Sequence, residues 1–159
     1  MRRRLAALAL LPVLALANNA QAAPTDPLGD LIKSVVSGAL PGAPVFNVRA
    51  TLYHAGAKGV GALDSLGCKV VPMRTMAVDT RLIPKRTVIF IKETVGLKMP
   101  GGGVHDGYWY ASDVGGAIKG ERIDLYTGGG AGSMRALQQV DLSKVTAVKV
   151  GEFKGCPPN

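Results

Sequence analysis

The chain has 159 residues, a formal net charge of +8 at pH 7, and only two cysteines and two histidines. This length favours one domain with a modest core. The cysteines and histidines do not have the spacing of zinc ligands, and no other pattern predicts a metal or a cofactor. The lysines are scattered and form no basic stripe with interleaved aromatic residues, which argues against a nucleic-acid binder. The moderate basicity fits either an anionic partner, such as cell-wall polymer or lipid headgroups, or ordinary solubilising charge.

Residues 1–22 have the layout of a secretory signal peptide. Three arginines precede an apolar run, and Ala20-Gln21-Ala22 is a small-x-small cleavage site. The apolar run is about half the ~20 residues that a membrane-spanning helix needs. No cysteine lies near the predicted cut, which argues against a lipid anchor. We therefore expect a soluble exported protein, periplasmic or secreted, that begins near Ala23 and has lost the three leading arginines.

The rest of the chain divides into a leader and a β-rich domain. Residues 23–44 are rich in Pro, Gly and Ala and form the predicted leader, in which residues 30–40 are predicted to form one short helix with Asp30 as N-cap. Residues 45–159 form the predicted domain. A short helix is expected at 133–140, with Ser133 as a possible cap. Short β-branched or aromatic segments predict strands at 45–54, 75–80, 87–93, 107–113, 122–127 and 146–153. Six short strands with one or two small helices favour a compact all-β barrel.

The two cysteines, Cys68 and Cys156, lie 88 positions apart. In an oxidising compartment one disulfide is the simplest account of such a pair. It would tie the C-terminal tail to an early loop and contribute roughly 4–5 kcal/mol on the chain-entropy model. Free thiols and intermolecular pairing are the alternatives.

Two aspartates stand at unusual places in the predicted strands. Strand alternation places Asp124 on the face opposite to Ile123 and Leu125, and it places Asp113 on the same face as Trp109. The turn between the two strands can bring the acids together. Alternatively, Asp113 and a third acid, Asp79, cap turns by bonding backbone N–H groups, and Asp124 pairs with Arg122. The pattern alone leaves both interpretations open.

Two separated blocks of sequence carry a family resemblance. The segments AVDTRLIPKRTVIFI (77–91) and ASDVGGAIKGERIDLYTG (111–128) resemble the 3D domain, which is named for its three aspartates. This domain occurs in the membrane-bound lytic transglycosylase MltA and in small exported cell-wall enzymes. The resemblance extends over roughly residues 47–151. It implies a six-stranded double-psi β-barrel, which agrees with the number of strands predicted independently.

The resemblance implies a reaction and a role for each acid. The expected protein is an exported lytic transglycosylase that cleaves peptidoglycan between N-acetylmuramic acid and N-acetylglucosamine and leaves a 1,6-anhydro sugar. Asp124 matches the proposed general acid of the family. Asp113 would raise the pKa of Asp124 and orient it, and Asp79 would position a loop or the substrate. If Arg122 reached Asp124, it would lower the pKa of that acid.

The chain departs from the family motif at three positions. Thr80 replaces a proline, Arg86 replaces a turn glycine, and Val114 replaces a threonine beside the second acid. Because valine has no hydroxyl, the chain lacks the group that in the motif's threonine would contact the acids or the sugar.

Several side chains are candidates for contact with the glycan. The aromatic rings of Tyr53, Trp109, Tyr110 and Tyr126 would stack on sugar rings, or else belong to the barrel core. Lys119 would bind muramyl-peptide carboxylates, or else be only solvated.

Two other functions fit the same residues. One is a glycoside hydrolase on the same barrel, with Asp113 and Asp124 as an acid and base pair. The other is a non-catalytic module that binds or loosens the cell wall, as expansin-like barrels do. Val114, the small size and the lack of the second domain that forms the groove of MltA favour the binding module. A partner protein would then complete the groove.

Overall fold

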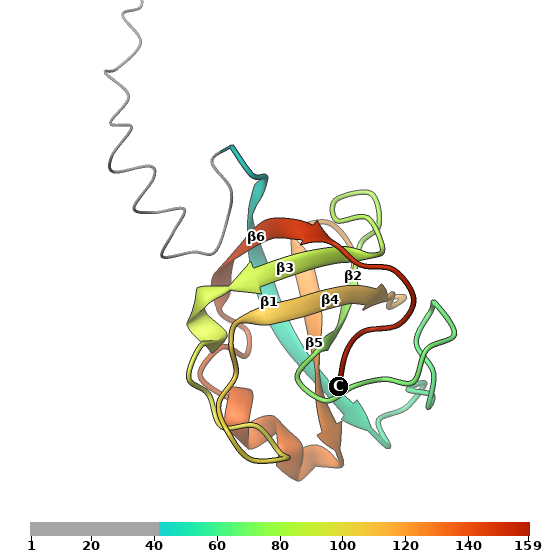
Figure 1. Cartoon of the computed structure of the whole chain (residues 1–159). Coiled ribbons are helices and arrows are strands. Elements are labelled where there is room, and N and C mark those ends of the chain that lie inside the picture. Colours follow the sequence, from blue (N-terminus) through green and yellow to red (C-terminus); the bar gives the residue numbers. More distant parts are fainter. Residues whose placement is uncertain (1–41) are drawn as a thin grey trace, which may run out of the picture.

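In the computed structural model, residues 42–159 are described, and they fold into a closed barrel of six strands (Figure 1). The strands are β1 (Val45–Ala55), β2 (Thr75–Val78), β3 (Thr87–Ile91), β4 (Tyr108–Asp113), β5 (Arg122–Gly129) and β6 (Lys144–Glu152). Two short 3₁₀ helices, η1 (Lys92–Thr94) and η2 (Ala131–Leu137), follow β3 and β5. The mainly β class and the six predicted strands are confirmed.

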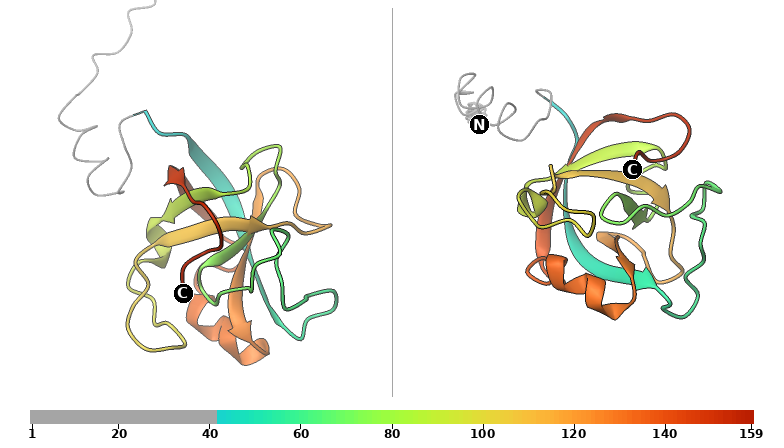
Figure 2. Two further views of the ribbon diagram at one scale, coloured as in Figure 1. Left: turned by 45° about the vertical axis from the view of Figure 1, so that its right-hand side comes forward. Right: turned by 60° about the horizontal axis from the view of Figure 1, so that its bottom comes forward.

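The strands are ordered β1-β5-β2-β4-β3-β6 around the barrel. The pairs β1–β5 and β2–β4 are parallel, and the other four pairs are antiparallel. The chain passes β5 on its way from β1 to β2, and it passes β2 on its way from β4 to β5 (Figure 2). Strands that are distant in sequence are therefore neighbours in space.

Alternating side chains of the strands fill the barrel. Val48 and Ala50 of β1 and Ile123 and Leu125 of β5 are fully buried, while the residues between them are at least partly exposed. The predicted inward face of β5 is thus confirmed. Each fully buried large aliphatic side chain contributes about 1.5–3 kcal/mol through removal from water. Leu137 of η2 belongs to the same core, so this helix covers one end of the barrel (Figure 1).

Several element boundaries differ from the predictions. The helix expected at 133–140 is the 3₁₀ helix η2, which begins at Ala131 after Gly130. Ser133 lies inside η2, and its hydroxyl contacts the carbonyl oxygen of Gly130 and the hydroxyl of Thr127. The strand at 75–80 ends at Val78, because the chain turns at the next residue. The predicted signal peptide, the helix at 30–40 and the leader up to residue 41 lie outside the described residues.

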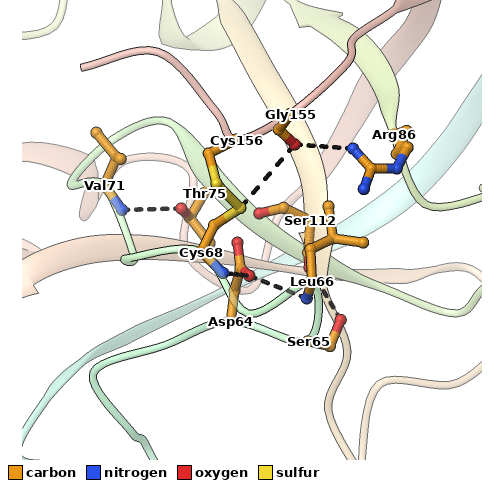
Figure 3. The surroundings of a disulfide bond; sticks show 10 residues. All are labelled: Asp64, Ser65, Leu66, Cys68, Val71, Thr75, Arg86, Ser112, Gly155 and Cys156. Carbon is orange, nitrogen blue, oxygen red and sulfur yellow. Dashed lines mark hydrogen bonds between the residues drawn. A yellow bond between two sulfur atoms is a disulfide. The ribbon is translucent and has the colours of Figure 1, made fainter.

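The predicted disulfide between Cys68 and Cys156 is present, with the two Cα atoms 5.5 Å apart (Figure 3). The C-terminal tail reaches it after β6 and contacts Arg86 on the way. The backbone N–H of Phe153 donates to the carbonyl oxygen of Arg86, and the Arg86 guanidinium donates to the carbonyl oxygen of Gly155. The disulfide therefore fastens the tail to the loop that follows β1.

No helix within residues 42–159 combines the length and apolar character needed to cross a membrane.

Candidate active site

An extra residue in β4 sets the direction of Asp113. Met76 of β2 pairs with Ala111, but the next residue, Ala77, pairs with Asp113. Ser112 is therefore a β-bulge, which interrupts the alternation of faces along β4. Because paired residues point to the same face of a sheet, Asp113 shares the face of Ala77 and not that of Met76. The prediction that Asp113 shares a face with the buried residues of β4 is wrong for this reason.

The bulge brings Asp113 and Asp124 onto one face. Ala77 pairs with Asp113 on one side and with Asp124 of β5 on the other. Two strand spacings separate the acids, which places their Cα atoms about 10 Å apart. The single methyl group of Ala77 leaves space between the carboxyl groups. A pocket of about 420 Å³ lies there, lined by the two acids, Tyr53 and residues of the loops 57–63 and 114–118.

Asp124 is half-buried, and its pKa is higher than that of an ordinary aspartate. Burial raises the pKa of Asp124 above its ordinary value of 3.8. A hydrogen bond from Thr51 and the charge of Arg122 oppose this rise, and the charges of Asp141 and Asp113 add to it. The pKa of Asp124 is raised overall, so the protonated form of this acid is more favoured in the folded protein than it is for an aspartate in water.

The hydroxyl of Thr51 lies between two acceptors. It is 2.8 Å from Oδ1 of Asp124 and 3.0 Å from the carbonyl oxygen of Ile123. A hydroxyl has one proton to donate. It can donate to ionised Asp124, or it can donate to Ile123 and accept the proton of neutral Asp124. Thr51 therefore offers a partner to both protonation states of the acid.

Three donors hold Asp113 in place. Tyr53 donates its phenolic O–H to Oδ2 at 3.1 Å, and the backbone N–H groups of Ser65 and Val114 donate to Oδ1. Burial, followed by the charge of Asp113, raises the pKa of Tyr53 far above its usual range. Tyr53 therefore keeps its proton and remains a donor to Asp113.

Asp79 is absent from the residues that line the pocket. Its carboxylate accepts two hydrogen bonds from the Arg81 side chain and one from the backbone N–H of Gly120 at 2.7 Å. The Arg81 guanidinium holds the pKa of Asp79 well below its usual range. Asp79 thus ties the end of β2 to the loop that runs from Val114 to Glu121.

Residues 74–138 match the family model of the 3D domain, and this segment includes Asp79, Asp113 and Asp124. The match spans 65 of the 159 residues. The resemblance seen in the sequence is therefore confirmed at the level of the domain. No curated protein matches the chain.

Three similar solved structures illustrate the range of the structural matches. E. coli MltA with bound chitohexaose is 22% identical with a TM-score of 0.42, and the match covers 62% of this chain and 30% of that one. The lytic transglycosylase LtgG of Burkholderia pseudomallei is 28% identical with a TM-score of 0.40, covering 64% and 28%. A membrane-bound lytic murein transglycosylase of Agrobacterium tumefaciens is 22% identical with a TM-score of 0.41, covering 56% and 25%. This chain spans less than a third of each of them.

The aromatic residues predicted to contact a glycan separate into core and pocket. Trp109 is fully buried, donates its ring N–H to Thr94 and stacks on His105, so it has no face for a sugar. Tyr53 lines the pocket between the acids. Tyr126 is 5% exposed, packs against Tyr53 with ring centroids 5.1 Å apart, and lines an adjoining pocket of about 430 Å³.

Tyr110 is partly exposed, and its ring packs edge-to-face with the ring of Phe153. Lys119 is exposed and is not among the residues that line the pocket between the acids, whereas Lys58 is. Sequence reasoning missed Lys58 and Thr51. Thr51 lies two positions before Tyr53 on β1, so strand alternation places both side chains on the same outward face, and this pattern could have identified Thr51.

Val114 presents a 43% exposed apolar side chain at the rim of the pocket. Within residues 42–159, no three His, Cys, Asp or Glu side chains are grouped so that they could hold a metal ion.

Proposed function

We propose that the protein is an exported peptidoglycan lytic transglycosylase with Asp124 as its single general acid. The observation that carries the proposal is the placement of Asp124 in a pocket, half-buried and with a raised pKa. An acid that donates a proton near neutral pH must have a pKa above the usual ~3.9 of an aspartate. The 3D domain match, which spans all three aspartates, supports the assignment.

The reaction needs no second carboxylate to activate water. Asp124 gives its proton to the glycosidic oxygen that leaves with N-acetylglucosamine. The 6-hydroxyl of the muramyl residue then attacks its own anomeric carbon, and its proton goes to the Asp124 carboxylate. The products are a 1,6-anhydromuramyl end and a free 4-hydroxyl, and the acid is restored. Because the nucleophile belongs to the substrate, it is already close to the reacting carbon.

Asp113 and its donors support this chemistry in two ways. The charge of Asp113 contributes to the raised pKa of Asp124. The Asp113 carboxylate also faces the same pocket, where its negative charge stabilises the positive charge that develops at the anomeric carbon. Tyr53 fixes the direction of Asp113 through its hydrogen bond. In this scheme Asp79 positions the loop 114–121 and does not touch the substrate.

We also assign the double-psi topology and export to this protein. The two crossing connections, from β1 to β2 past β5 and from β4 to β5 past β2, support the topology. The disulfide between Cys68 and Cys156 supports an oxidising compartment, in line with the signal-peptide pattern of residues 1–22.

A non-catalytic wall-binding module is the second candidate. The exposed side chain of Val114 beside Asp113 favours it, because the pocket lacks a hydroxyl at this position. In that case a partner protein would complete the substrate groove. A hydrolase that uses Asp113 and Asp124 as acid and base would differ in its products.

Mass spectrometry of digested peptidoglycan tests the proposal. Wild-type protein should release anhydromuropeptides, and Asp124→Asn should release none. Asp106→Asn, at an acid half exposed and outside the pocket, is the matched control and should retain activity. Products with reducing ends would establish the hydrolase. Absence of soluble products from the wild type, with the protein still pelleting with the wall, would establish the binding module.

A further inference from the structure

Three cationic side chains stand side by side on neighbouring strands. Arg49 of β1 pairs with Arg122 of β5 on one side and with Lys144 of β6 on the other. We call these three residues the cationic row. No acidic residue is interleaved in it. Within residues 42–159, none of the three makes an ion pair with an acidic side chain.

The cationic row faces outward on the same surface as the catalytic acid. The residues that follow its members along the strands, Ala50, Ile123 and Val145, are all buried, so the row itself points away from the core. Arg122 lies two residues before Asp124 on β5, and Arg49 lies two residues before Thr51 on β1. Two residues along a strand correspond to about 7 Å. The row therefore begins beside Asp124 and extends across β1 to β6.

The row is both accessible and electrostatically unfavourable. Arg49 and Lys144 are exposed and Arg122 is partly exposed. Like charges directly opposite each other on paired strands are destabilising, by up to about 1 kcal/mol per pair. Within the described residues, neither Glu121 nor Asp141 forms an ion pair with the row, and Asp124 interacts with Arg122 through its charge without an ion pair. An anionic ligand with several charges would relieve this repulsion.

We propose that the cationic row binds the carboxylates of the stem peptide attached to the muramyl residue whose glycosidic oxygen Asp124 protonates. This inference rests on the proposed function. The stem peptide branches from the sugar in the pocket and carries several carboxylates, so its charges must lie within a short distance of Asp124. The row supplies cations in that position. The row, and not Lys119, is therefore the peptide-binding element of the site.

Binding of soluble fragments tests the row independently of cleavage. The ligands are a disaccharide muropeptide with free peptide carboxylates and the same compound with those carboxylates amidated, and the measurement is isothermal titration calorimetry with the purified protein. Wild-type protein should bind the free form about fivefold to tenfold more tightly. Arg49→Gln/Lys144→Gln should lose this preference and bind both ligands alike. Lys98→Gln/Lys154→Gln, which removes two exposed charges elsewhere, should keep it. Arg122 is left unchanged because its charge acts on the pKa of Asp124.

The outcomes separate this inference from the proposed function. Equal binding of the two ligands by wild-type protein would overturn the inference, and so would an equal loss in the control variant. A different result would assign the row to a phosphate polymer instead. In that case wild-type protein would bind polyphosphate more tightly than the muropeptide, and Arg49→Gln/Lys144→Gln alone would lose polyphosphate binding while its muropeptide binding stayed unchanged. If the muropeptide preference is present and the wild type still releases no anhydro product, the row stands and the transglycosylase proposal fails. The ratio of the affinities for the free and the amidated muropeptide should also fall at about 1 M salt, because the Debye length there is about 3 Å.

Discussion

Single residues decide which groups meet in the pocket. Without the extra residue Ser112, the alternation of β4 would turn Asp113 towards the core and away from Asp124. Ala77 then separates the two acids with the smallest side chain that a strand commonly carries. Arg86 adopts φ +69°, a conformation that favours the glycine found at this position in the resembling family motif. Its backbone hydrogen bonds to Ala111 and to the C-terminal tail hold it there.

At this scale, Asp124→Asn should stabilise the fold while removing the acid. The pKa of Asp124 is raised in the folded state, so the stability that this group contributes is fully present below its ordinary value of 3.8 and is lost as the pH rises through the folded value. A neutral asparagine avoids that loss. We expect a gain of about 0.5–1 kcal/mol near pH 7, kept small by solvent screening of the half-buried group, and a smaller gain towards pH 4. Thermal unfolding of both proteins across this range measures it. A variant less stable than wild type near pH 7 would identify Asp124 as a structural anion.

At the scale of elements, the loop between β4 and β5 builds one wall of the pocket. Asp79 fastens its far end through the N–H of Gly120, and Ile118 anchors its middle with only 5% of its surface exposed. Gly115 permits this packing, because a Cβ atom there would lie 2.6 Å from a side-chain carbon of Ile118. At Gly116 the same atom would meet nothing within 4 Å.

The two glycines form a matched pair of variants. On the proposed function, Gly115→Ala should displace Ile118 and lower the rate of peptidoglycan cleavage by about tenfold, since small displacements at a catalytic site are costly. Gly116→Ala should leave the rate unchanged. Initial rates, together with the methyl NMR signal of Ile118, distinguish the variants. An equal loss in both would mean that the flexibility of the loop matters and the packing of Ile118 does not.

At the scale of the whole molecule, the disulfide closes a long segment of chain. It links the loop after β1 to the tail after β6, so all strands from β2 to β6 lie inside the closed segment. The tail also contacts Arg86 through two hydrogen bonds, which add little by comparison.

Cys68→Ser/Cys156→Ser should lower the free energy of unfolding by about 4–5 kcal/mol. The reason is the larger conformational entropy of an unfolded chain that is no longer closed over a separation of 88 residues. Urea unfolding of the double variant beside oxidised wild type measures the change. A loss below about 1 kcal/mol would show that the tail contacts hold this region without the covalent bond.

The sequence by itself determined the local features of this protein. Short β-branched segments between turns predicted all six strands, because alternation and turn residues act over a few positions. The two cysteines, together with the oxidising compartment expected for an exported protein, predicted one disulfide, and the motif around Asp113 and Asp124 identified the candidate acids.

Only the tertiary structure decided which residues face one another. The bulge at Ser112, the burial of Trp109 and the alignment of Arg49 with Arg122 and Lys144 all depend on register between strands that are distant in sequence. A shift of register by one residue moves every side chain of a strand to the other face, and no local pattern determines that register. For this reason the sequence predicted which acids belong to the site, while the fold placed Asp113 and Asp124 in one pocket beside the cationic row.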